Sequence, residues 1–273
     1  MNLDQNVWQQ WNDTLPVLEL GISLERASNN IGKKIACLVF DNCLPSNLEV
    51  LCEISESVST AVFSSSNPLA GQINISQAVD GIIDEMGVMS DKYIARTFAQ
   101  SYEAISDEDH CIAVDLKSQA YEKSLENLRI AFSGLTKWLD ENEQNQDAFR
   151  NQLNQCFQKY MMCGEKDSII DVFYVIQTLM DINEIPKNIK ATLTRFLNNI
   201  NTAIIHKTQL NENNQEVGLY LYAPTDRQEY LYNRPYYVRS KFSSITNWNR
   251  ILDFLYLDKS IQTLSWNQIK EEV

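Results

Sequence analysis

The spacing of apolar positions predicts that helices alternate with short buried strands in the first third of the chain. Apolar side chains recur near helical spacing in residues 15–31, which predicts an amphipathic helix that stops at an Asn-Asn-Ile-Gly stretch. The apolar run IACLVF follows at 35–40 and has the length and composition of a buried strand. A helix that leads directly into a buried strand is typical of α/β architecture.

Helical patterns dominate the rest of the chain. A helix is predicted at 46–58, with Ser46 placed to cap its start against Glu49, and a second short strand at 59–66 runs into a loop at 64–71. Further helical patterns cover residues 73–87, 90–105, 112–140, 147–163, 167–179, 185–205 and 246–257. The segment GLYLYAP alternates like a late strand and stops at a proline.

Composition and charge exclude several classes of protein. The 273 residues are 44% hydrophobic, which is enough to build a sizeable core. The formal net charge of -13 argues against binding to nucleic-acid phosphates, which depends on lysine and arginine. The tyrosine-rich stretch at 225–242 is therefore interpreted as an ordered loop that packs on the sheet, or alternatively as a surface that docks a partner chain, and not as a platform for single-stranded nucleic acid.

The sequence contains no membrane-spanning or export signal that we can identify. No run of about 18 apolar residues is present, and the N-terminal segment lacks the basic-then-apolar order of a secretory signal. We therefore expect no membrane span. The compartment stays open between the cytoplasm and export through a signal located upstream.

The cysteines and histidines do not form a metal-binding pattern. The six cysteines include no CxxC pair, and the chain has two histidines, His110 and His206. We therefore expect no metal site and no cofactor. Six cysteines in a chain of this length also do not indicate a disulfide scaffold, so buried free thiols are expected for most of them.

Cys43 is the cysteine placed best for chemistry. It follows the predicted strand at 35–40 by three residues and precedes the next predicted helix. Open α/β sheets place their ligand crevices beyond the carboxyl ends of their strands. Amides at a nearby helix start would favour a thiolate, and the backbone N-H of Cys43 could help to hold an oxyanion. On position alone, a buried structural cysteine is an equally good interpretation.

Several segments resemble the clostripain family of cysteine peptidases in order and spacing. KIACLVFDNCLPSNLEVLCEI looks like the family's strand, FDAC-type nucleophile turn and following helix, and AVFSSSNPLAG is similar to its next strand and loop. HCIAVDLKSQAYEKSLENL, IIDVFYVIQTL and EVGLYLYAP then resemble its aspartate-leucine helix start, its DLYDF-type helix and its GLSIYFP-type strand. Together these short motifs span the chain from about residue 15 to about residue 255.

The resemblance implies a caspase-like three-layer α/β sandwich of the gingipain and clostripain type. The N-terminal strands would be missing here, and a mostly helical region with a late strand would follow the sheet. Residues 1–105 would be the C-terminal part of the α/β catalytic core, and residues 106–273 the helical region and closing strand of the same unit.

The resemblance also implies hydrolysis of peptide bonds after arginine or lysine, with Cys43 as the nucleophile. Asp41 matches the family's aspartate at the floor of the primary specificity pocket, where a carboxylate would pair with a cationic substrate side chain. Ser65 and Ser66 stand at substrate-binding positions where the family has acidic residues. A turn or capping aspartate is the alternative interpretation of Asp41.

The catalytic histidine expected in the family would lie upstream of this chain. A cysteine nucleophile of this type needs a histidine base, and His110 and His206 match no such position. The first hypothesis is therefore a cysteine endopeptidase whose histidine comes from a companion chain. The second is a catalytically inactive pseudopeptidase or protein-interaction module. In either case the strand at 35–40 should present a sheet edge that a partner or the chain itself covers.

Overall fold

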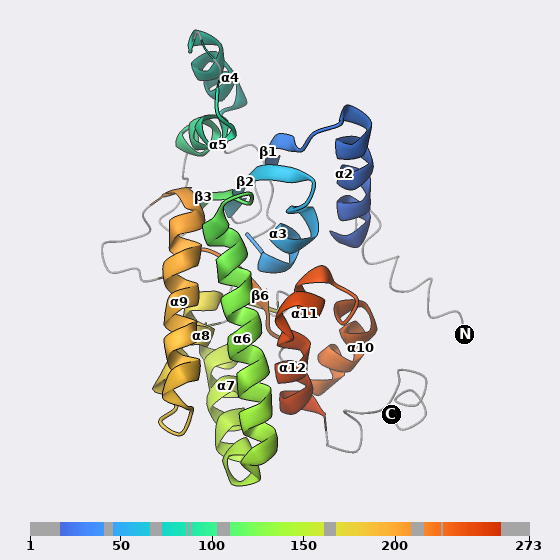
Figure 1. Cartoon of the computed structure of the whole chain (residues 1–273), viewed down its shortest axis with the longest axis vertical. Helices are drawn as coiled ribbons and strands as arrows, with labels where there is room; N and C mark the ends of the chain where they lie inside the picture. Colours follow the sequence, from blue (N-terminus) through green and yellow to red (C-terminus); the bar gives the residue numbers. More distant parts are fainter. Residues whose placement is uncertain are drawn as a thin grey trace, which may run out of the picture.

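A computed structural model describes residues 17–40, 46–65, 73–85, 87, 89–102, 110–160, 168–208, 216–224 and 226–257. For Ser64, Ser65 and His110 it describes the backbone. The described chain is mixed α/β, with a four-stranded sheet, a two-stranded sheet and mostly helical content (Figure 1). The α/β class predicted from the sequence is confirmed at this level.

The four-stranded sheet has the order β1-β2-β3-β5 and places β1 at one edge. Its strands are β1 (Ile35–Phe40), β2 (Val58–Ser65), β3 (His110–Asp115) and β5 (Ile204–Lys207). β1 and β2 are parallel, and α3 (Leu48–Ile54) makes the crossover between them. β3 runs antiparallel to both β2 and β5.

Helices cover both faces of this sheet because its inner strands are apolar on both sides. α5 (Asp91–Gln100), with α4 (Ile75–Asp84) beside it, packs against the face that carries Val62 and Ala113. α3 and α6 (Gln119–Glu141) share the core on the opposite face with Phe63 and Val114. Side chains of a strand alternate between the two faces, so β2 is buried on both.

The helical part is organised around α6, which packs along α9 (Lys187–Ala203) (Figure 1). The remaining helices here are η1 (Glu143–Asn145), α7 (Gln146–Tyr160) and α8 (Val172–Asp181). A small antiparallel sheet of β4 (Ile169–Asp171) and β6 (Tyr220–Tyr222) lies behind α6 in this view. Its strands join segments that are about 50 residues apart in the sequence.

The C-terminal helices pack on α3, α6 and α7. They are α10 (Arg227–Tyr237), α11 (Lys241–Thr246) and α12 (Trp248–Tyr256). Trp248 is fully buried, its ring centroid lies 5.0 Å from that of Phe132, and its indole Nε1 donates to the Tyr222 carbonyl oxygen at 2.9 Å. The first described helix, α2 (Val17–Ile31), packs on α3.

The structure corrects several predictions made from the sequence. The helices expected at 112–140, 167–179 and 185–205 each include residues that are strand, in β3, β4 and β5. Residues 227–237 form α10 and not a loop on the sheet. Asn47, and not Ser46, caps α3. Tertiary pairing decides such short apolar segments, because periodicity alone does not separate a strand from the end of a helix.

Among the described helices, none is long and apolar enough to cross a membrane. The division of the chain at residue 105 stays a prediction.

A buried ion pair between α10 and α12 offers a test of this packing. Arg234 donates to both carboxylate oxygens of Asp253, at 2.6 and 3.1 Å, and Tyr230 Oη donates to the same carboxylate at 2.7 Å. The two charged side chains are 11% and 3% exposed. Asp253→Ala should therefore lower the free energy of unfolding by about 3–5 kcal/mol, because it leaves a buried guanidinium unpaired. Urea unfolding would measure the change. Lys137→Ala, which removes an exposed pair with Glu141, should change it by less than about 0.5 kcal/mol.

Candidate active site

The structure describes the segments on either side of the predicted nucleophile turn. Asp41, Cys43 and Ser66 lie outside the described residues, and Ser65 is the last residue of β2. Phe40 ends β1, and the described chain resumes at Ser46. The geometry of the site therefore follows from these flanking residues.

Strand register brings three chain segments to the same edge of the sheet. Phe40 pairs with Phe63, and their rings stack with centroids 4.6 Å apart. Two residues further along β2, Ser65 pairs with His110 at the start of β3. The ends of β1 and β2 and the start of β3 thus lie together, and Asp41 directly follows the first of these ends.

Neither histidine lies on a strand that neighbours β1. His110 begins β3, which β2 separates from β1, so its backbone is about 10 Å from the line of β1 at ordinary strand spacing. His110 thus belongs to the sheet. His206 lies in β5 opposite Ala113. Partial burial and, to a smaller extent, the charge of Arg96 lower the pKa of His206.

The exit of the turn is tied to the segment that leads into β6. The backbone N-H of Tyr220 donates to the Ser46 carbonyl oxygen at 2.8 Å, and the Ser46 hydroxyl donates to the Gly218 carbonyl oxygen. Asn47 forms a parallel bridge with Tyr220. Ser46 is fully buried by these contacts. The chain is therefore fixed three residues after Cys43.

The amides at the start of α3 already have a partner. Asn47 Oδ1 accepts from the backbone N-H of Glu49 at 2.7 Å and from that of Val50 at 3.4 Å. An N-cap of this kind satisfies donors that would otherwise attract an anion. The helix start is thus less available to stabilise a thiolate than its place in the sequence suggests.

Glu49 is a buried carboxylate six residues after Cys43. Its Oε1 accepts from the Tyr237 hydroxyl at 2.7 Å and from the backbone N-H of Tyr222 at 3.1 Å. Its Oε2 is buried and has no hydrogen-bond partner. Burial raises the pKa of Glu49 from 4.5 to about 7, although both hydrogen bonds oppose this rise.

Asp171 is a second buried carboxylate on the other side of β6. Its Oδ2 accepts from the backbone N-H of Gly218 at 2.7 Å. Its Oδ1 accepts from the N-H groups of Phe173, at 2.8 Å, and Val217, at 3.3 Å, so it caps α8 as well. Burial raises the pKa of Asp171 to about 7 against these hydrogen bonds.

Sequence patterns did not single out these two carboxylates. Glu49 was expected only as a capping partner, and Asp171 stands inside a predicted helix. A lone acidic residue in an apolar run is a signal that could have drawn attention to each, because buried carboxylates need hydrogen-bond donors. Apart from the N-H of Phe173, which Asp171 caps locally, the donors come from about 45 to 190 residues further along the chain and cannot be inferred from local sequence.

The cysteines that the structure describes have the character of structural thiols. Cys37, Cys52, Cys111 and Cys156 are free. Burial raises the pKa of Cys37 to about 11 and that of Cys52 to about 12, which opposes thiolate formation. Within the described ranges, no group of three His, Cys, Asp or Glu side chains is placed to hold a metal ion.

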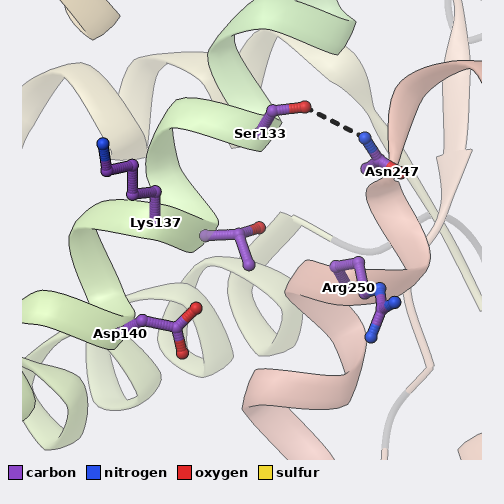
Figure 2. A pocket seen from close by; sticks show the side chains of 6 residues that line it. Ser133, Lys137, Asp140, Asn247 and Arg250 are labelled. Carbon is purple, nitrogen blue, oxygen red and sulfur yellow. Dashed lines mark hydrogen bonds between the residues drawn. The ribbon is translucent and has the colours of Figure 1, made fainter.

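A polar hollow of about 460 Å³ lies between α6 and the junction of α11 and α12, away from the sheet edge. Figure 2 shows Ser133 from α6 accepting a hydrogen bond from the Asn247 side chain at 3.0 Å, with Lys137, Asp140 and Arg250 around it. Its lining has no nucleophile paired with a base, so the sheet edge remains the better candidate for catalysis.

Comparison with known proteins identifies the family. The sequence model of the Clostripain family matches residues 7–266, which is nearly the whole chain. The chain belongs to the clostripain family. Its members are hydrolases of the cysteine peptidase class, so the resemblance identified from the motifs is confirmed.

Solved clostripain-family structures share the fold at low sequence identity. A B. fragilis cysteine protease is similar with a TM-score of 0.51 and 13% identity, over 88% of this chain and 96% of that one. An inactive zymogen from Parabacteroides distasonis is similar with a TM-score of 0.56 and 13% identity, over 88% of this chain and 65% of the zymogen. A secreted cysteine protease from Bacteroides thetaiotaomicron has a TM-score of 0.52 and 12% identity, over 86% and 64% of the two chains. The chain thus spans about two thirds of the length of the latter two. A search of the curated proteins found no match.

The raised pKa of Glu49 predicts how stability depends on pH. The unfolded chain ionises this group near pH 4.5, whereas the folded protein holds the proton up to about pH 7. Raising the pH through this interval therefore favours the unfolded state, by about 3 kcal/mol from this group. Glu49→Gln cannot ionise, so it should remove this share of the stability loss between pH 4.5 and 7. The part of the stability loss that comes from ionisation of Asp171 should remain in this variant.

Denaturant unfolding at a series of pH values would measure this effect. Glu141→Gln, at an exposed position on α6, is the control and should leave the pH dependence unchanged. An identical pH dependence in wild type and Glu49→Gln would contradict the assignment.

Proposed function

We propose that this chain is the nucleophile-bearing part of a cysteine endopeptidase that cleaves after arginine or lysine. The observation that carries the proposal is that a clostripain-family sheet edge, where β1 ends at Phe40, leads directly into Asp41 and Cys43. The Cys43 thiolate would attack the carbonyl carbon of the substrate and form a thioester as the amine leaves. Water would then hydrolyse the thioester.

Asp41, Ser65 and Ser66 are proposed to contact the substrate. Asp41 follows the last residue of β1, and Ser65 ends the neighbouring parallel strand, so both leave the sheet at the same edge. A carboxylate there would pair with a basic side chain of a peptide or protein substrate. The Bacteroides thetaiotaomicron structure is of a complex with an irreversible peptide inhibitor, which supports a peptide as the ligand class.

The catalytic histidine is proposed to come from a companion chain that pairs along β1. Within the described part of the protein, β1 has one strand partner, β2, and all six of its residues are half-buried. The strand carries no charge, proline or bulge that would protect an open edge. The neighbouring helix α2 also exposes Leu18 and Ile22. An added strand there would extend the sheet toward the proposed caspase-like three-layer sandwich.

A catalytically inactive pseudopeptidase or interaction module is the alternative. It is favoured by the positions of the two histidines, which lie on β3 and β5 and not beside β1. The two hypotheses differ in whether Cys43 reacts with a substrate-like probe. They agree on the fold and on the place of β1 at the edge of the described sheet.

An arginine-based, thiol-reactive peptide probe would test the peptidase hypothesis. Wild-type chain should be labelled at Cys43, alone or with a companion polypeptide, and Cys43→Ala should abolish labelling. Asp41→Ala should slow labelling by about 10- to 100-fold, because it removes a charged partner of the substrate side chain. Mass spectrometry of the labelled peptide would identify the site.

A norleucine probe of the same length is the matched control. Asp41→Ala should leave the labelling rate with the norleucine probe unchanged, because the norleucine side chain carries no charge that could pair with Asp41. If no combination labels Cys43, the inactive interaction module is the better account.

The position of β1 at the edge of the described sheet predicts association. The Ile35 N-H donates to Ser57 on the β2 side, so by alternation the Ala36 N-H faces outward. We expect the isolated chain to self-associate through this edge, and Ala36→Pro to weaken association by removing an outward donor. Ala36→Ser keeps the donor and should behave like wild type in sedimentation velocity. A stable wild-type monomer whose β1 amides exchange rapidly with solvent would be inconsistent with this edge as a pairing surface.

A further inference from the structure

Two buried carboxylates hold the same short segment from opposite sides. Asp171 accepts from the backbone of Gly218, at the start of the segment 218–222, and Glu49 accepts from the backbone of Tyr222, at its end. Both carboxylates are less than 10% exposed. We call the segment 218–222 with these two side chains the turn anchor.

The turn anchor contacts Ser46 and Asn47, which are the first two described residues after Cys43. Gly218 links the two partners directly, because its N-H donates to Asp171 while its carbonyl oxygen accepts from the Ser46 hydroxyl. Tyr220 lies beside Ser46 and Asn47. Gly218 has a φ of 78°, in the left-handed region that favours glycine. The hydrogen bonds to Asp171 and Ser46 hold its two peptide groups in this orientation.

We propose that Asp171 and Glu49 are positioning residues for Cys43, acting through the turn anchor. The inference rests on the proposed function of Cys43 as the nucleophile. β2 holds the entrance of the turn through its pairing with Phe40, whereas the exit depends on the segment 218–222. Asp171 is linked to Ser46 through Gly218 by hydrogen bonds, so this role does not require that Asp171 touch the substrate.

The hydrogen bonds predict that the two carboxylates differ in what can replace them. Both oxygens of Asp171 accept hydrogen bonds from N-H groups, so the amide of Asp171→Asn must turn its NH2 group toward at least one backbone N-H. Glu49 accepts through Oε1 alone, and its Oε2 has no partner. Glu49→Gln can therefore keep both hydrogen bonds, whereas Glu49→Leu loses them.

Saturation kinetics of Cys43 labelling by the arginine-based probe would test the proposal. Asp171→Asn and Glu49→Leu should lower the maximal labelling rate by about 10- to 100-fold, because misplacing a reacting atom by about 1 Å has an effect of this size. The probe concentration at half-maximal rate should change by less than about twofold, since Asp41 lies on the entrance side of the turn. Glu49→Gln should stay close to wild type.

Asp253→Asn is the matched structural control. Asp253 is also a buried, hydrogen-bonded carboxylate, but its hydrogen bonds to Arg234 and Tyr230 link α12 to α10 and not to the turn anchor. It should lower stability without changing the maximal labelling rate of the folded protein. Equal losses in Asp171→Asn and Asp253→Asn, in proportion to the unfolded fraction, would overturn the proposal.

A small reagent separates failure of this inference from failure of the proposed function. Iodoacetamide needs no specificity pocket, so the alkylation rate of Cys43 can be measured even if the peptide probe labels nothing. Asp171→Asn should shift that rate at least about threefold toward the rate of the urea-unfolded chain, and Glu49→Gln should not. If Asp171→Asn leaves both the alkylation rate and the labelling rate unchanged, the turn anchor does not position Cys43.

Discussion

The burial of β2 on both faces is the constraint on which the rest of the sheet depends. β2 pairs in parallel with β1 and antiparallel with β3, and its central residues have no solvent exposure. Because each strand is held in register by this central partner, the end of β1 and the start of β3 must lie at the same edge. β1 ends at that edge with Phe40, directly before Asp41 and Cys43 in the sequence. The position of the candidate site is thus a consequence of strand pairing before any catalytic side chain is considered.

Two carboxylates are buried in this core, and they differ in how fully they are hydrogen-bonded. Asp171 satisfies both of its oxygens with backbone N-H groups, while Glu49 leaves one oxygen without a partner. Burial of such groups is unfavourable unless they form hydrogen bonds, so each must be held by the backbone around it. Both lie against the strand that borders the exit of the nucleophile turn. These two buried carboxylates are therefore placed where a fixed backbone conformation matters for the proposed chemistry.

Much of the fold could be predicted from local patterns, but strands β3 and β5 of the four-stranded sheet could not. Residues 35–40 were identified because an apolar run of six residues between polar segments has few alternatives. β3 and β5 were missed because each adjoins a long amphipathic helix, so that their apolar residues extend a helical pattern. What makes them strands is pairing with β2 and with each other. That pairing joins residues about 50 and 95 positions apart, and no local window contains it.

The sequence by itself determined the α/β class, the family and the identity of Cys43 and Asp41 as candidates, because these depend on the order of short motifs along one strand and its turn. Only the tertiary structure decided the arrangement around the turn. It placed His110 and His206 away from β1, gave the helix start a cap at Asn47, and brought Asp171 to the backbone that holds Ser46. The physical reason is that a buried carboxylate takes its donors from whichever backbone packs against it. That choice is made by the packing of the whole chain and not by neighbouring residues.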